Sequence, residues 1–242
     1  RIKMTDLLAM QWQQITASSW VMLLSVTGFW LGMSVYRRSS EKPLLHPLII
    51  GTPFIAILLV LMSVDFDQYY KANGLLSWLL GPATVALAVP LAKYLKQMSK
   101  VIPILTIAVL FGGFFAAVSA LSLALWLTSE PIMMLSIAAK SVTTPIAMVI
   151  TQQLGGLITL ITPIVLFTGI IGILVAPRVF HIVGLEDERW QGLILGVTAH
   201  AIGTLKAFEK SPRCGAFSTI GMGLNGIWTS IFLVPMIQIF TV

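Results

Sequence analysis

Long apolar runs are separated by short polar or basic stretches along almost the whole chain. A helix needs about 20 predominantly apolar residues to cross a bilayer. Because the runs are continuous rather than alternating, they indicate helices and not the strands of a transmembrane β-barrel. The pattern predicts an all-α polytopic membrane protein of about eight spans, at residues 18–36, 44–64, 75–96, 101–127, 132–154, 157–176, 190–207 and 215–240.

Two of these segments, 75–100 and 132–156, contain helix-disturbing residues within apolar sequence. In the first they are Gly81, Pro82 and Pro90, and in the second it is Pro145. Proline has no N–H to donate and disturbs the carbonyl four residues earlier, so both segments are predicted to be broken or re-entrant helices. Paired interrupted segments in a membrane protein point to a transport site near the middle of the bilayer.

The same two segments resemble each other at an offset of 59 residues, which predicts an internal repeat. The matching positions are Leu76/Leu135, Ser77/Ser136, Thr84/Thr143 and Ala88/Ala147. The copies are parallel if every segment crosses once and inverted if one is re-entrant, and the sequence leaves both alternatives open.

Basic residues cluster at 37–42, 93–100 and 206–213, which the positive-inside rule places in the cytoplasm. With one crossing per segment, the polar loop at 65–74, Glu130 and the mixed-charge loop at 178–189 fall outside. One re-entrant segment would invert every assignment after it. Residues 1–17 are expected to form an N-terminal extension or an interfacial helix.

Composition supports a single integral membrane domain over residues 1–242. The chain is 57% hydrophobic and only 10% charged, and its mean hydropathy is +0.94, whereas soluble domains carry about 25% charged residues. The net charge of +6 comes from short loops and does not indicate nucleic-acid binding. With Cys214 as the only cysteine, no disulfide framework, metal site or cofactor is expected, and no motif of an enzyme is present.

Lys140 is the first candidate site residue, because it lies close to mid-membrane in the segment 132–156. A lysine at that depth is costly and normally faces a partner, a cavity or water. Thr143, Thr144 and Pro145 follow it, so hydroxyls and unpaired backbone groups accompany the cation. This combination suits a small anion, and Thr84 beside Gly81 and Pro82 is the candidate contact from the other interrupted segment. The alternatives are a lysine that reaches the interface and threonines that join helices.

His200, Thr204 and Asn225 complete the candidate set. His200 and Thr204 are four residues apart and are predicted to share a helix face, where the histidine could relay a proton. The alternative is a structural histidine in a packed bundle. Asn225 is a polar amide in an apolar span, and it either binds a ligand or bridges helices.

Four stretches carry a family resemblance: Leu79–Leu95 (LLGPATVALAVPLAKYL), Lys140–Met148 (KSVTTPIAM), Gly192–Glu209 (GLILGVTAHAIGTLKAFE) and Gly215–Ile237 (GAFSTIGMGLNGIWTSIFLVPMI). With Lys42–Ile50 (KPLLHPLII), they make the chain from residue 44 onward similar to the LrgB/CidB family. The resemblance implies either a holin/antiholin-like regulator of murein hydrolases and lysis or a transporter of small organic acids such as glycolate, glycerate or pyruvate.

A buried cation between interrupted segments favours the transporter. We therefore expect a secondary carrier of small monocarboxylates in the bacterial inner membrane, with a proton as a candidate coupling ion, and no enzymatic activity. The lysis regulator is the alternative. The resemblance also implies a small LrgA/CidA-like membrane partner, and a homodimer is expected.

Overall fold

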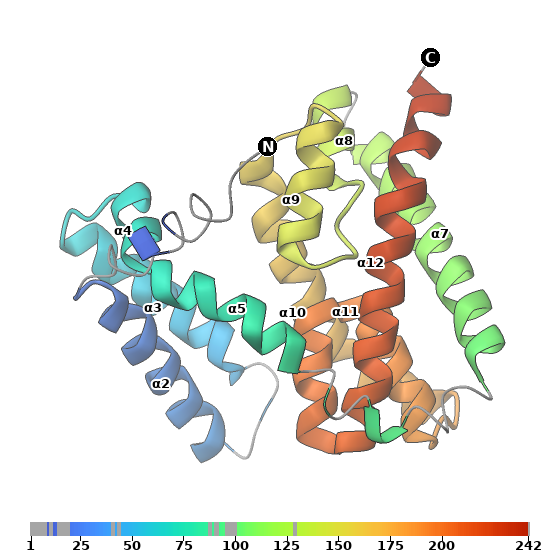
Figure 1. Cartoon of the computed structure of the whole chain (residues 1–242), viewed down its shortest axis with the longest axis horizontal. Coiled ribbons are helices and arrows are strands. Elements are labelled where there is room, and N and C mark those ends of the chain that lie inside the picture. The colour runs from blue at the N-terminus through green and yellow to red at the C-terminus, as the bar shows by residue number, and fades with distance from the viewer. Residues whose placement is uncertain are drawn as a thin grey trace. The chain divides into compact units, whose positions relative to one another are not determined.

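The computed structural model describes residues 9, 12–13, 20–39, 42, 45–86, 89, 92–94, 101–127 and 130–241. All regular elements in these ranges are helices, so the all-α prediction is confirmed (Figure 1). The chain divides into two compact units, Arg1–Ala86 and Leu87–Val242. The prediction for residues 1–17 lies outside the described residues, apart from helical positions 9, 12 and 13.

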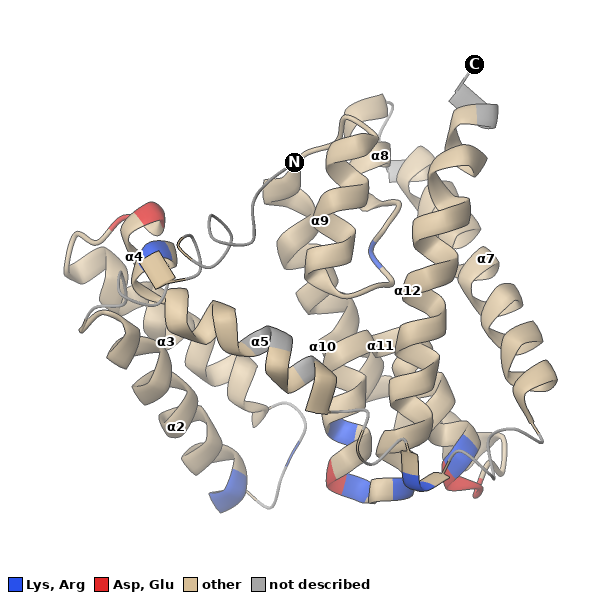
Figure 2. Ribbon diagram, in the orientation of Figure 1, with Lys and Arg blue, Asp and Glu red and all other residues tan. Residues whose placement is uncertain are grey.

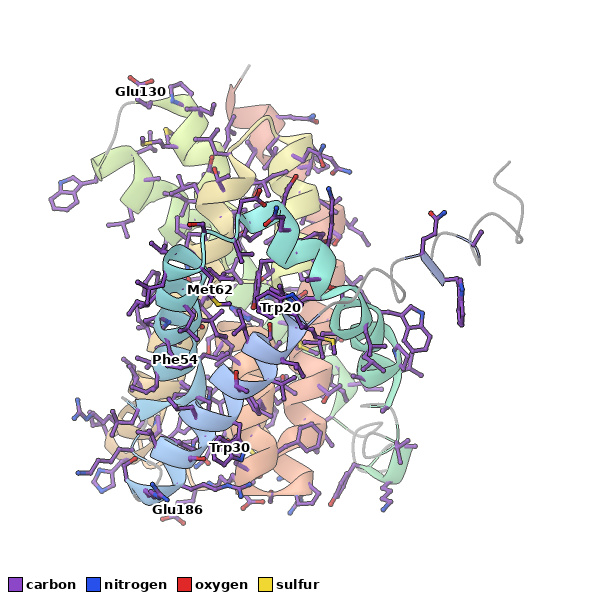
Figure 3. All side chains as sticks on the ribbon, turned by 90° about the vertical axis from the view of Figure 1, so that its left-hand side faces the viewer. Trp20, Trp30, Phe54, Met62, Glu130 and Glu186 are labelled. Carbon is purple, nitrogen blue, oxygen red and sulfur yellow. The ribbon has the colours of Figure 1, made fainter. Side chains whose placement is uncertain are left out.

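The first unit contains α2 (Met22–Arg38), α3 (Pro47–Leu61), α4 (Phe66–Ala72) and α5 (Gly74–Ala86). Helices α2 and α3 pack through glycines: a Cβ added at Gly51 would lie 2.7 Å from the Gly28 carbonyl oxygen. Small residues allow this close backbone approach inside a membrane, where lipid tails are as apolar as leucine. Large side chains point outward instead, among them Trp30, which is 70% exposed (Figure 3).

Two predictions for this unit are wrong. The expected polar loop at 65–74 contains α4, because the Asp65 side chain accepts a hydrogen bond from the Gln68 N–H at 2.8 Å and caps the helix. The helix break expected at Gly81 and Pro82 is absent, since α5 runs from Gly74 to Ala86 with Pro82 inside it. The proline removes only the hydrogen bond to the carbonyl four residues earlier, and membrane helices tolerate such a loss.

The second unit contains the remaining helices. They are α7 (Ile102–Leu127), α8 (Pro131–Ile137), α9 (Thr144–Gln153), α10 (Ile158–Ile182), α11 (Glu188–Lys210) and α12 (Pro212–Thr241). Helix α10 extends six residues beyond the predicted end at 176, so residues 178–182 are helical rather than part of a loop.

Helices α8 and α9 form a re-entrant hairpin, which we call hairpin A (residues 131–156). Between them the chain is non-helical from 138 to 143 and reverses direction (Figure 1). It then returns to its starting level, because the Leu157 N–H donates to Ser136 Oγ at 2.6 Å and a Cβ added at Gly156 would lie 2.8 Å from the Ser136 nitrogen. Hairpin A therefore enters the unit and leaves it at the same end.

Helix α11 is folded back on itself at His200 and forms a second hairpin, hairpin B (residues 188–210). The His200 backbone has φ 43° and ψ −124°, a conformation that is rare for a residue with a side chain. Gly203 packs directly against the Leu195 carbonyl, and Ser211 Oγ donates to Glu188 Oε2 at 2.7 Å across 23 residues. The prediction of one span at 190–207 is therefore wrong.

The two hairpins start from opposite ends of the unit. Figure 3 shows Glu130, which precedes hairpin A, and Glu186, which precedes hairpin B, at opposite ends. Apart from Glu130 and the basic position in the loop between α8 and α9, the charges in the described part of this unit gather at the Glu186 end, which we call the basic end (Figure 2). Hairpin A thus inverts the predicted topology after it, and the loop at 178–189 lies at the same end as residues 206–213, as the positive-inside rule prefers.

Three described helical stretches are long and apolar enough to cross a membrane: Ile102–Trp126, Ile158–Ile182 and Pro212–Gln238. A fourth candidate is the pair α3 and α4, which is bent by 118°. Their outward side chains are large and apolar, for example Phe111 and Trp126, which are 73% and 81% exposed. These are features of a membrane protein, whose outer surface faces hydrocarbon.

Candidate functional site

The tips of the two hairpins meet at Asn225 on α12. The Asn225 Nδ2 group donates to the Ser141 carbonyl of hairpin A at 2.7 Å and to the Val197 carbonyl of hairpin B at 3.3 Å. Both carbonyls belong to chain reversals, where helical partners are missing. Asn225 therefore bridges helices, one of the two predicted roles, while its buried Oδ1 has no hydrogen-bond partner in the described residues.

Lys140 lies in the non-helical tip of hairpin A and is half-buried. Its Nζ donates to Ser141 Oγ at 3.3 Å, a long contact with a neutral hydroxyl. The two ion pairs found in the described part of the chain, Asp187–Arg189 and Glu209–Lys206, do not include it. The cation thus sits at the meeting point of the hairpins, and no carboxylate of the described residues pairs with it.

The first turn of α9 lies beside this cation. Thr143 is the N-cap residue of α9, with extended backbone, and its side chain makes no capping hydrogen bond. Thr144 begins the helix and Pro145 follows in its first turn, so helix α9 starts at the tip and runs away from it. The start of a helix carries a partial positive charge and favours an anion nearby.

His200 forms the tip of hairpin B and is only 3% exposed. The imidazole lies close to the backbone of Val165 on α10 and in electrostatic range of Lys140. Its ring packs on Gly169, where an added Cβ would lie 3.0 Å from His200 Cε1. The Nε2 atom is buried and has no partner among the described residues, so it is a polar group available to a ligand.

Thr204 has a structural role. Its hydroxyl donates to the His200 carbonyl at 2.8 Å and lies 2.9 Å from Ser218 Oγ of α12. The predicted helix face shared by His200 and Thr204 does not exist, because the helix reverses at His200. Instead, Thr204 holds the reversal and ties hairpin B to α12.

The structure brings together Lys140, Thr143, Thr144, His200 and Asn225 from two hairpins and α12. The other predicted residues belong elsewhere: Pro82 lies in α5 of the first unit, and the side chains of Gly81 and Thr84 and the whole of Pro90 lie outside the described residues. Sequence reasoning missed Val165 and Val197, because they contribute backbone groups, which no side-chain pattern reveals. It also missed Ser141, which contributes both its carbonyl and its hydroxyl.

A cavity of about 570 Å³ opens at the basic end between α10 and hairpin B, next to the ion pair at the start of α11. Its walls include apolar Phe180 and Leu195 and the side chain of Lys210, which donates to Gln191 Oε1. At the nearby start of α11, the Arg189 guanidinium donates to Asp187 Oδ2 at 2.9 Å and lowers the pKa of that carboxyl to about 2. These contacts fix the base of hairpin B.

Comparison with known proteins finds bacterial relatives that match most of this chain. The uncharacterized protein YwbG of Bacillus subtilis is 33% identical over 86% of this chain and 92% of its own length. An uncharacterized protein of Haemophilus influenzae is 32% identical over 88% and 92%. The holin-like protein CidB of Staphylococcus epidermidis is 27% identical over 91% and 96%.

No solved structure matches this chain. The model of the LrgB-like family matches residues 25–239, which include both hairpins and the helices of the second unit except the last two residues of α12. The resemblance read from the sequence motifs is confirmed: the chain belongs to the LrgB-like family.

Proposed function

We propose that this protein is a secondary carrier of small 2-hydroxy or 2-oxo monocarboxylates, such as glycolate, glycerate or pyruvate, in the bacterial inner membrane. The observation that carries the proposal is Lys140, a cation at the meeting point of two hairpins without a carboxylate partner in the described residues. Charged residues inside membrane proteins mark substrate paths and pair with other groups. A carboxylate substrate supplies the countercharge.

The neighbouring groups fit the rest of such a substrate. Thr143 and Thr144 offer hydroxyls at the start of α9, and the second half of α11 also begins at the tip, beside His200. Two helix starts at one point favour negative charge. The buried Nε2 of His200 suits a substrate hydroxyl or oxo group, and a histidine at this place gives the proton a candidate path.

The two re-entrant hairpins and the basic end also lead to a membrane topology. Of the eight predicted segments, we propose that 132–154 and 190–207 are re-entrant and that the other six cross, which makes the protein multi-pass with the basic end in the cytoplasm. The repeat at an offset of 59, the homodimer and an LrgA/CidA-like partner remain parts of the proposal, and no enzymatic activity is included.

Uptake of labelled glycolate, glycerate and pyruvate into liposomes that contain the purified chain tests the carrier. We expect saturable uptake, competition between the acids and a response to a proton gradient. Lys140→Ala and His200→Ala should each abolish uptake, whereas Lys71→Ala, an exposed lysine of α4, should not. Unchanged uptake in both site variants would exclude this site.

A holin-like regulator of murein hydrolase activity and lysis is the second candidate, and the name of the CidB relatives favours it. It predicts non-saturable leakage of unrelated small solutes through the reconstituted protein. Leakage that Lys140→Ala leaves unchanged would support the regulator and contradict the carrier.

A further inference from the structure

Residues 131–182 and 188–241 have the same construction in opposite directions. Each stretch is a re-entrant hairpin followed at once by a long helix: hairpin A and α10 in the first, hairpin B and α12 in the second. Because hairpins A and B enter from opposite ends, α10 and α12 run antiparallel (Figure 1). This is the topology of an inverted repeat.

The two stretches also align in sequence at an offset of 60. Identical pairs are Leu135/Leu195, Ala139/Ala199, Thr144/Thr204, Ala147/Ala207 and Gly155/Gly215. Both members of the two alanine pairs are at most 1% exposed. In the same register the tip residue Lys140 corresponds to His200, so the two candidate cationic side chains occupy equivalent places.

The contacts correspond as well. In hairpin A, Ser136 contacts the start of α10 through Leu157, and in hairpin B the equivalent Gly196 packs on the Ser218 carbonyl of α12. At the tips, Ser141 of hairpin A accepts a hydrogen bond from Asn225 of α12, and His200 of hairpin B packs on α10 at Gly169, close to the Val165 backbone. Positions 165 and 225 are themselves 60 residues apart. Each tip thus contacts the long helix of the other repeat.

The symmetry is broken at one side chain. At position 165 the contact uses the backbone, whereas at position 225 an amide reaches both tips at once, to the Ser141 and Val197 carbonyls. Its Oδ1 faces α7, where a Cβ added at Gly113 would lie 3.0 Å away. No other described side chain donates to both hairpins.

We propose that these stretches form an inverted repeat in which the two hairpins are gates to opposite sides of the membrane, and that Asn225 is the positioning residue that holds both gates closed over the site. Hairpin A opens toward the Glu130 end and hairpin B toward the basic end. The gating role rests on the proposed carrier function, while the repeat and the contacts of Asn225 do not.

The test uses single cysteines at equivalent tip positions, Ser141→Cys and Ala201→Cys, in a Cys214→Ala background. A membrane-impermeant maleimide is applied to right-side-out and to inside-out vesicles. We expect Ser141→Cys to react only from the Glu130 side and Ala201→Cys only from the side of the basic end. Reaction of both cysteines from the same side would overturn the inverted repeat.

Asn225→Ala added to each cysteine variant tests the positioning role. We expect both labelling rates to rise about fivefold, since one buried hydrogen bond fewer shifts the closed–open equilibrium by about that factor. Asn225→Gln, which keeps the donor, should restore slower labelling, and Ser230→Ala, another polar residue of α12, should have no effect. Rates unchanged by Asn225→Ala would contradict the role. If that variant does not fold, unchanged rates for Asn225→Leu, which fills a similar space without a donor, would contradict it.

Cysteine labelling in the presence of glycolate distinguishes the carrier function from the inverted repeat. Protection of both cysteines by glycolate supports gates over a substrate site. Opposite sidedness that persists without protection supports the inverted repeat and contradicts the carrier function.

Discussion

The Asn225 side chain donates to the carbonyl of Ser141 at 2.7 Å, across 84 residues of sequence. A second hydrogen bond from the same amide nitrogen reaches the Val197 carbonyl. A single amide in a long apolar helix thereby supplies donors to two chain reversals that enter the protein from opposite ends. Polar groups buried in a membrane protein must find such partners inside the protein, because hydrocarbon offers none.

Asn225→Ala is expected to destabilise the protein, because it leaves two carbonyls without this donor. Unsatisfied buried acceptors cost about 1–3 kcal/mol. Thermal unfolding in detergent measures the loss, with Ser230→Ala as the control, since that hydroxyl only bonds its own helix at Gly226. Equal stability of the two variants would show that the bridge contributes nothing.

Gly196→Ala is expected to destabilise the contact between hairpin B and α12. The added methyl group would meet the Ser218 carbonyl, part of a helix backbone that cannot rotate away, and overpacking of this kind costs about 1–3 kcal/mol. Gly223→Ala is the matched control because nothing lies within 4 Å of its added Cβ. Gly223→Ala should be neutral or slightly stabilising, by up to about 1 kcal/mol from helix propensity. A neutral Gly196→Ala would contradict the close packing.

Lys140→Met is expected to raise thermal stability while it abolishes carboxylate uptake. A half-buried cation without a carboxylate partner among the described residues costs desolvation energy, and methionine has a similar length without the charge. Such an exchange of stability for activity is characteristic of functional residues. Unfolding and uptake should be measured on the same preparation, with Lys71→Met as the exposed control. Lower stability in Lys140→Met would mean that the lysine has a structural partner.

Thr204→Val is expected to destabilise hairpin B, whereas Thr204→Ser should keep wild-type stability. Valine has the shape of threonine but removes the hydroxyl that contacts the His200 carbonyl and Ser218 Oγ. A double-mutant cycle with Ser218→Ala isolates the interaction between the two hydroxyls. We expect a coupling energy of about 0.5–1.5 kcal/mol; a value near zero would show that the two hydroxyls do not interact.

Asp187→Asn tests the ion pair at the base of hairpin B. Arg189 lowers the pKa of Asp187 to about 2, below its ordinary value near 4. Because the folded-state pKa is the lower one, the stabilisation is present above about pH 4 and disappears as the pH falls toward 2. The difference in melting temperature between Asp187→Asn and wild type should therefore be constant from pH 5 to 8 and shrink below pH 4. A difference that persists at pH 2 would exclude the ion pair as its cause.

The sequence by itself determines that the protein is an all-helical membrane protein of the LrgB-like family. Hydrophobic run length is a local property, so it located α7, α10 and α12 to within a few residues except at the C-terminal end of α10. The cost of placing a lysine in apolar sequence is also local, and it made Lys140 a candidate before any contact was known.

Only the tertiary structure decides where the chain reverses. Pro145 correctly marks the start of α9, but Pro82 lies inside a continuous helix, because a lost hydrogen bond breaks a helix only when surrounding contacts favour the break. At His200 no proline is present, and the reversal depends on Gly203 packing against Leu195 and on Thr204 bonding the His200 carbonyl. These contacts join residues after a turn that the helical period does not predict. Hydrophobicity therefore determines which segments enter the membrane, and packing determines which of them cross it.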